Sequence, residues 1–160
     1  MSGAKTLRIG VNSFFGGIII RFMSDFKSKK VGIDAPCEAV FAKLSNLENL
    51  RSLAPLAESK GIEIKNITSD SCSLGVPKVG DIALSVEKRV PHSLIRLVGQ
   101  TVLTSSLSIE IQLSSEEVSS TGLVLLLDAD IPFFARMMVE KPLKDGLDKV
   151  AELLSKVQYT

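Results

Sequence analysis

The strongest constraint on this chain is a series of six short segments, between residues 61 and 130, in which apolar and polar residues alternate. The clearest of them is residues 107–113, LSIEIQL. Alternation with a period of two is typical of a strand that has one buried and one exposed face. Short links rich in turn-forming residues separate the segments. The pattern therefore predicts an antiparallel sheet that is covered on one side.

The other elements can be placed around these segments. A first strand occupies 26–33, and two short helices follow, one after Pro36 and one from Leu47 to Leu53 that Pro55 ends. Residues 114–121 are interpreted as turn material. The six later strands are predicted at 61–65, 71–76, 79–90, 94–102, 107–113 and 123–130.

The C-terminal segment supplies the cover for the sheet. Its spacing predicts a helix with one apolar face, and its opposite face carries i,i+4 pairs of opposite charge, such as Lys141 with Asp145 and Asp145 with Lys149. Pro142 is expected to begin or bend this helix, because proline lacks the amide hydrogen. The apolar residues recur every three or four positions, at Val139, Leu143, Leu147, Val150, Leu154 and Val157.

The predicted order is one strand, two short helices, six strands and a long helix. It indicates an α+β fold in which a curved antiparallel sheet of about seven strands wraps around the C-terminal helix. Three stretches stand out within this order: APCEAVFAKLSN, VGDIALSVEKRVPHSLIRL and MMVEKPLKDGLDKVAELL. Together they resemble the helix-grip fold of the START-like (SRPBCC) superfamily. That superfamily includes birch-pollen-allergen-type proteins, polyketide cyclase/dehydrase-like proteins and lipid-transfer domains.

Residues 1–22 differ from the rest of the chain. Lys5 and Arg8 precede an apolar patch from Phe14 to Ile20, which is much shorter than the roughly 20 residues that span a bilayer. The segment also lacks the long apolar run and small-residue cleavage site of a secretory signal. We interpret 1–22 as an N-terminal extension and 23–160 as a single helix-grip domain. An arm that lies on a membrane surface or packs on the core is the alternative.

The resemblance implies a cavity between the sheet and the helix. The inward faces expected there are apolar, which favours a pocket for a small hydrophobic ligand or lipid. Arg96 and Gln100 would contact a polar head group if the faces of their strand were reversed. The predicted cavity residues are Leu84, Val86, Leu97, Ile109, Leu125, Phe134, Met138, Leu143 and Leu147.

Catalytic residues are not indicated. His92, the only histidine, lies in a turn, and Cys37 and Cys72 are interpreted as inert thiols without a disulfide. Asp128 and Asp130 share one face of a strand and point away from the predicted core, as solvated charges do.

Composition limits the partners. The net charge of +1 gives no field that would attract nucleic acid. A single histidine rules out a His-rich metal site. We therefore expect no metal, no cofactor, no nucleic-acid partner and no membrane span, and the two cysteines favour a cytoplasmic location.

Three functions remain open at this point. The first is a non-catalytic carrier of a small hydrophobic ligand. The second is a polyketide cyclase/dehydrase-like enzyme, which would need polar groups converging inside the pocket. The third is a protein-interaction module of the chaperone-stimulating type, which would need an exposed apolar patch. The apolar inward faces favour the first, although one fold can host many functions.

The interpretation of residues 1–22 is testable. A chain that begins at Met23 should unfold with the same free energy as the full chain, within about 0.5 kcal/mol, because an extension contributes little to the core. Denaturant titration of the two chains measures this difference. A loss of more than about 2 kcal/mol would show that the segment packs into the core.

Overall fold

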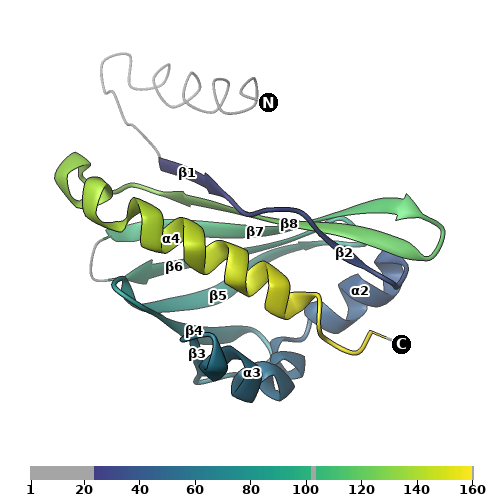
Figure 1. The fold of residues 1–160 in the computed structure, drawn as a ribbon. Coiled ribbons are helices and arrows are strands. Elements are labelled where there is room, and N and C mark those ends of the chain that lie inside the picture. Colours follow the sequence, from purple (N-terminus) through teal and green to yellow (C-terminus); the bar gives the residue numbers. More distant parts are fainter. Residues whose placement is uncertain (1–23, 102–103, 160) are drawn as a thin grey trace, which may run out of the picture.

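A curved antiparallel sheet holds the long C-terminal helix against its concave face (Figure 1). The computed structural model describes residues 24–101 and 104–159. In chain order the elements are β1 (Ser24–Lys27), β2 (Val31–Ile33), α2 (Cys37–Leu44), η1 (Leu47–Leu53, a 3₁₀ helix), α3 (Ala54–Ser59), β3 (Glu63–Lys65), β4 (Ser71–Val76), β5 (Gly80–Val90), β6 (Leu94–Thr101), β7 (Thr104–Glu117), β8 (Ser120–Ala129) and α4 (Phe133–Leu154).

The strands form one antiparallel sheet. Their order across the sheet is β1-β8-β7-β6-β5-β4-β3, and β2 also pairs with β8. Each strand from β3 to β8 pairs with its neighbour in the sequence. The N-terminal strands close the other side of the sheet by pairing with β8. The predicted α+β helix-grip fold is therefore confirmed.

The first predicted strand is divided into two. Lys27 pairs with Leu126 and Val31 pairs with Leu123, so the N-terminal strands carry one more residue than β8 over this interval. Ser28 holds the irregular part in place. Its amide donates to the Leu125 carbonyl at 2.9 Å, and its Oγ accepts the Leu125 amide at 2.9 Å. The side chain thus replaces a backbone partner that a regular strand would have supplied.

The helical segment after β2 continues further than predicted. Asn46 caps η1 by accepting the Glu48 amide at 3.0 Å. The helix predicted from Leu47 to Leu53 has the bounds of η1. Pro55 was expected to end the helical segment, but a further helix, α3, begins at Ala54 and carries Pro55 in its first turn. Proline is tolerated there because the first amides of a helix have no carbonyl partner within it. The segment from Cys37 to Ser59 therefore forms three consecutive short helices.

The hairpin between β7 and β8 is tighter than the sequence suggests. Residues 114–121 were expected to form a turn, yet Ser114 pairs with Gly122 and Ser115 with Thr121. Both strands therefore continue almost to the tip of the hairpin, which extends past the rest of the sheet (Figure 1). Serine and threonine are compatible with an exposed paired strand, so their polarity alone did not indicate a loop.

The apolar face of α4 covers the sheet. Val139, Leu143, Leu147 and Leu154 are all buried, as their spacing predicts. Pro142 lies inside the helix rather than at its start. On the outer face, Lys141 and Asp145 form the expected i,i+4 ion pair at 3.9 Å. Burial of each such leucine contributes about 1.5–3 kcal/mol to folding relative to an exposed one, so this face is the main support of the fold.

The predicted division between 1–22 and 23–160 concerns an N-terminal segment that lies outside the described residues, and it stays a prediction. In the part of the chain that the structure describes, no helix combines the length and the apolar character required to cross a bilayer.

The role of Ser28 can be tested directly. Ser28→Ala should lower the free energy of unfolding by about 1–3 kcal/mol, because it leaves the buried Leu125 amide without an acceptor. Ser52→Ala is the matched control, since Ser52 is exposed and its hydroxyl lies 3.4 Å from the Asn49 carbonyl. Chemical denaturation measures both variants. Equal stability of the two variants would contradict the assigned role of Ser28.

Candidate ligand-binding site

An apolar cavity of about 80 Å³ lies between the sheet and α4. Residues of β3 to β8 form one side, α4 forms the opposite side, and the end is closed by leucines of α2 and η1. Among the described residues, every lining side chain is apolar except the thiol of Cys72. The cavity therefore offers dispersion contacts and no hydrogen bonds to a molecule inside it.

Six of the nine predicted cavity residues line this space. They come from four strands and from α4, so the tertiary structure brings together positions that are as far apart in the sequence as Leu84 and Leu147. The six are Leu84, Leu97, Ile109, Leu125, Leu143 and Leu147.

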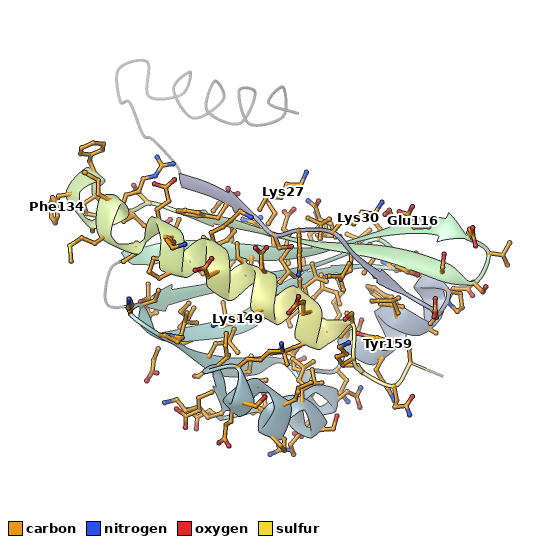
Figure 2. The ribbon with its side chains drawn as sticks, in the orientation of Figure 1. Lys27, Lys30, Glu116, Phe134, Lys149 and Tyr159 are labelled. Atoms are coloured by element: carbon orange, nitrogen blue, oxygen red, sulfur yellow. The ribbon has the colours of Figure 1, made fainter. Side chains whose placement is uncertain are left out.

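Three of the predicted residues lie elsewhere. Val86 is half-buried and packs against the core without lining the cavity. Phe134 and Met138 were expected to point inward, but their exposed fractions are 73% and 76%. Figure 2 shows Phe134 at the free end of α4, pointing away from the sheet. Ala135 and Val139 are the side chains that these first turns of α4 bury. Phe134 and Met138 each precede one of them by one position, about 100° away around the helix, so both project outward.

The sequence interpretation missed the part of the lining that comes from the short helices. Leu47, Leu50 and Leu53 of η1 are buried, and all three line the cavity. Their spacing of three residues matches the three residues per turn of a 3₁₀ helix, which places them on one face. The spacing of three residues is visible in the sequence and could have identified these leucines as lining residues. It indicates one buried face in a 3₁₀ helix and in an α-helix alike.

Of the described residues that line the cavity, Cys72 alone carries a reactive group. Burial raises the pKa of its thiol to about 11, because an apolar environment disfavours the charged thiolate. At neutral pH the group is therefore a protonated thiol and a poor nucleophile. It behaves here as a small apolar side chain.

Arg96 and Gln100 do not reach the cavity. They lie on the outer face of the sheet, where they line an open, partly polar hollow together with Ser108 and Asp128. The Arg96 guanidinium is held by Glu87 at 2.8 Å and by Glu110 at 2.9 Å. Two carboxylates neutralise this arginine, so it offers little net charge to a head group.

His92 and Cys37 both lie near α2 but do not form a catalytic pair. The His92 ring is exposed in the β5–β6 turn and packs edge-on against Phe41, with 5.9 Å between the ring centroids. Cys37 Sγ lies 3.5 Å from the Thr121 hydroxyl, which donates to the Ala35 carbonyl at 2.7 Å. Within the described residues no hydrogen bond joins the histidine to the thiol, and neither lines the cavity.

The prediction that Asp128 and Asp130 are solvated charges is wrong. They were interpreted as solvated charges, but Asp128 is only 9% exposed and Asp130 is half-buried. Asp128 does point to the outer face, as expected from the alternation. It is buried because β8 is flanked there by β1 and β7, which place Asp25 and Ser108 beside it.

A surface groove of about 380 Å³ adjoins the cavity. It runs between the turn after β4, at Pro77 and Lys78, and the middle of α4. Val76 and Gly146 line both the groove and the cavity, so these two residues form the wall between them. A Cβ on Gly146 would lie 3.1 Å from Cγ1 of Val76, which shows how closely the helix approaches β4 at this wall.

Comparison with known structures identifies the class of fold. A START superfamily protein from Mycobacterium smegmatis superposes with a TM-score of 0.59 at 18% identity, covering 83% of this chain and 94% of that one. Norcoclaurine synthase from Thalictrum flavum gives 0.64 at 13% identity, covering 85% and 93%. An aromatase/cyclase from Streptomyces sp. R1128 gives 0.59 at 17% identity, covering 84% and 92%. No protein-family model and no curated protein matches the sequence.

The chain thus has the START-like helix-grip fold. At these identities the likeness shows the fold alone, and two of the three similar structures are named as enzymes while the third is not. The function has to be argued from the site of this chain.

The structure predicts that His92, which is exposed, and Cys37, which is half-buried, are dispensable for ligand binding. His92→Ala and Cys37→Ser should each leave the affinity for 1-octanol, an apolar probe, within about threefold of the parent, because neither side chain touches the cavity. Isothermal titration calorimetry measures the affinities. A loss of more than about tenfold in the affinity of either variant, about 1.4 kcal/mol, would contradict this placement.

Proposed function

We propose that this protein binds and carries a small hydrophobic ligand in the cavity between the sheet and α4, without catalysis. The observation that carries the proposal is the uniformly apolar lining of a cavity that lies one residue layer from a surface groove. Such a lining favours the apolar part of a ligand through burial, at about 0.8 kcal/mol for each methylene group.

The size of the cavity limits the ligand. About 80 Å³ is smaller than the roughly 150 Å³ apolar cavity that takes up benzene, and well below the roughly 300–1,000 Å³ of pockets for larger ligands. A thin alkyl chain suits this space better than a fused ring system. Longer chains require the lining leucines to adopt other rotamers, or α4 to move outward at its exposed first turns.

A polyketide cyclase/dehydrase-like activity is the alternative. It needs acidic, basic or hydrogen-bonding groups that converge on a substrate. In the described part of the chain, the cavity holds only the Cys72 thiol, whose pKa is raised to about 11 by burial. This chemistry supports a carrier rather than an enzyme.

A protein-interaction function is a second candidate, and a specific observation favours it. Four large apolar side chains at the start of α4 are at least 70% exposed: Phe133, Phe134, Met137 and Met138. Exposed apolar patches of this kind are typical of interaction sites. The two candidate functions are separable, because Phe133, Phe134 and Met137 do not contribute to the cavity or the groove.

We further propose a cytoplasmic location. Both cysteines are free, which supports a reducing compartment.

A series of straight-chain alcohols tests the carrier function. From 1-butanol to 1-octanol, the affinity should rise by about fourfold for each added methylene, which corresponds to about 0.8 kcal/mol. The increase should stop at the chain length that fills the cavity. Calorimetry measures the affinities, and methyl chemical shifts of the lining leucines locate the bound chain. Absence of binding across the whole series would contradict the proposal.

Leu143→Phe is the matching variant. Leu143 lines the cavity, so the larger ring should occupy the empty space, weaken 1-octanol binding at least tenfold and change the stability by less than about 1 kcal/mol. Leu123→Phe is the control, because Leu123 is fully buried but does not line the cavity. Overpacking there should cost about 1–3 kcal/mol. Equal destabilisation by both variants would show a filled core in place of a binding cavity.

A further inference from the structure

The groove beside the cavity is rich in positive charge. Its lining contains Lys78 from the turn after β4, and Lys141 and Lys149 from α4. Asp145 is the one acidic residue among the described residues that line it. Two segments that are more than sixty residues apart in the sequence therefore bring three ammonium groups to one hollow. Figure 2 shows Lys149 on the side of α4 that faces the lower strands of the sheet.

Most of this charge is not neutralised by the protein. Lys141 contacts Asp145 at 3.9 Å, and the lysine is 87% exposed. The sequence also predicts an ion pair between Asp145 and Lys149, but the two do not come within 4 Å. Within the described part of the chain, neither Lys78 nor Lys149 has a carboxylate partner. The groove thus carries a net charge of +2 directly outside the cavity wall.

The cavity and the groove have complementary chemistry. The cavity cannot satisfy a polar head group, because burying such a group without a hydrogen bond costs several kcal/mol. The groove can satisfy an anion, and only Val76 and Gly146 separate the two spaces. A molecule with an apolar chain and an anionic head would place each part in the environment that favours it.

The composition of α4 at this wall supports the same interpretation. Pro142 and Gly146 lie four residues apart, so they share one face of the helix, and both line the groove. In a helix interior glycine and proline are the two residues least favourable to the helix. The two residues weaken the helix where the groove meets the cavity. This is where α4 would have to bend to let a chain pass.

We propose that the ligand is an anionic amphiphile, whose alkyl chain lies among the leucines of the cavity and whose head group lies in the groove between Lys78, Lys141 and Lys149. This inference rests on the proposed carrier function and names the class of ligand. The head is a carboxylate or a phosphate monoester, since both present anionic oxygens to ammonium groups.

Three ligands of equal chain length provide the test. Decanoate should bind about fivefold tighter than 1-decanol at 50 mM salt, and decylammonium should bind more weakly than the alcohol. Exposed ion pairs are modest individually, so three lysines justify a factor of this size. The advantage of decanoate over the alcohol should shrink toward unity at 1 M salt, where charges are screened beyond about 3 Å. Decyl phosphate, run in parallel, distinguishes the two head groups.

Charge variants assign the effect to the groove. The triple variant Lys78→Asn, Lys141→Gln and Lys149→Gln should bind decanoate no better than 1-decanol and should bind the alcohol as the parent does. Asparagine is chosen at position 78 because the backbone there has a φ of 67°, which asparagine tolerates better than most residues. The matched control removes three lysines outside the groove, with Lys43→Gln, Lys88→Gln and Lys156→Gln.

The outcomes separate this inference from the proposed function. Equal affinity of the parent for decanoate and 1-decanol, or an equal loss in both triple variants, would overturn the anionic ligand while leaving the carrier function intact. Failure of all these ligands to bind would overturn both. Asp145→Asn provides a test in the opposite direction, because removing the single acid of the groove should increase the preference for decanoate by about twofold.

Discussion

The packing of one face of α4 against the concave side of the sheet supports the rest of this structure. Val139, Leu143, Leu147 and Leu154 are buried there, opposite the apolar rows of the central strands. The helix also contacts the link between β1 and β2, because Asp148 accepts the Lys29 amide at 2.8 Å and Glu152 pairs with Lys29. Glu152 pairs as well with Lys60, which follows α3. The helix α4 thus packs against the sheet through its apolar side chains and contacts the β1–β2 link through Asp148 and Glu152.

The same arrangement explains why a cavity remains. A curved sheet and a helix are in close contact along only part of their length. Side chains must fill the remaining space between them. In the described part of the chain this space is lined by leucine, isoleucine and valine with Cys72 and Gly146, and no aromatic ring is among the lining residues. Gly146 separates this space from the groove, and Pro142, one turn earlier on the helix, lines the groove. The cavity, its wall and the charged groove therefore follow from one packing geometry.

Much of the fold could be predicted because its signals are local. The alternation of 107–113 assigned Ile109 to the inner face and Glu110 to the outer face, as observed. Predictions that depend on neighbours were less accurate. Asp128 was assigned to the correct face, but its burial depends on β1 and β7 on either side. Phe134 and Met138 are apolar like core residues, yet both are exposed, because Ala135 and Val139 occupy the buried face of those turns.

The sequence alone determined the strands, their faces, the apolar stripe of the C-terminal helix and hence the α+β class, because backbone geometry imposes a period of two on strands and of 3.6 on helices. Only the tertiary structure decided which apolar residues enclose a cavity, and which lysines share a groove. Lys78 and Lys149 are brought together by the approach of β4 to α4 at Gly146. Such proximity depends on the curvature of the sheet and on where the helix crosses it, and no periodicity encodes either.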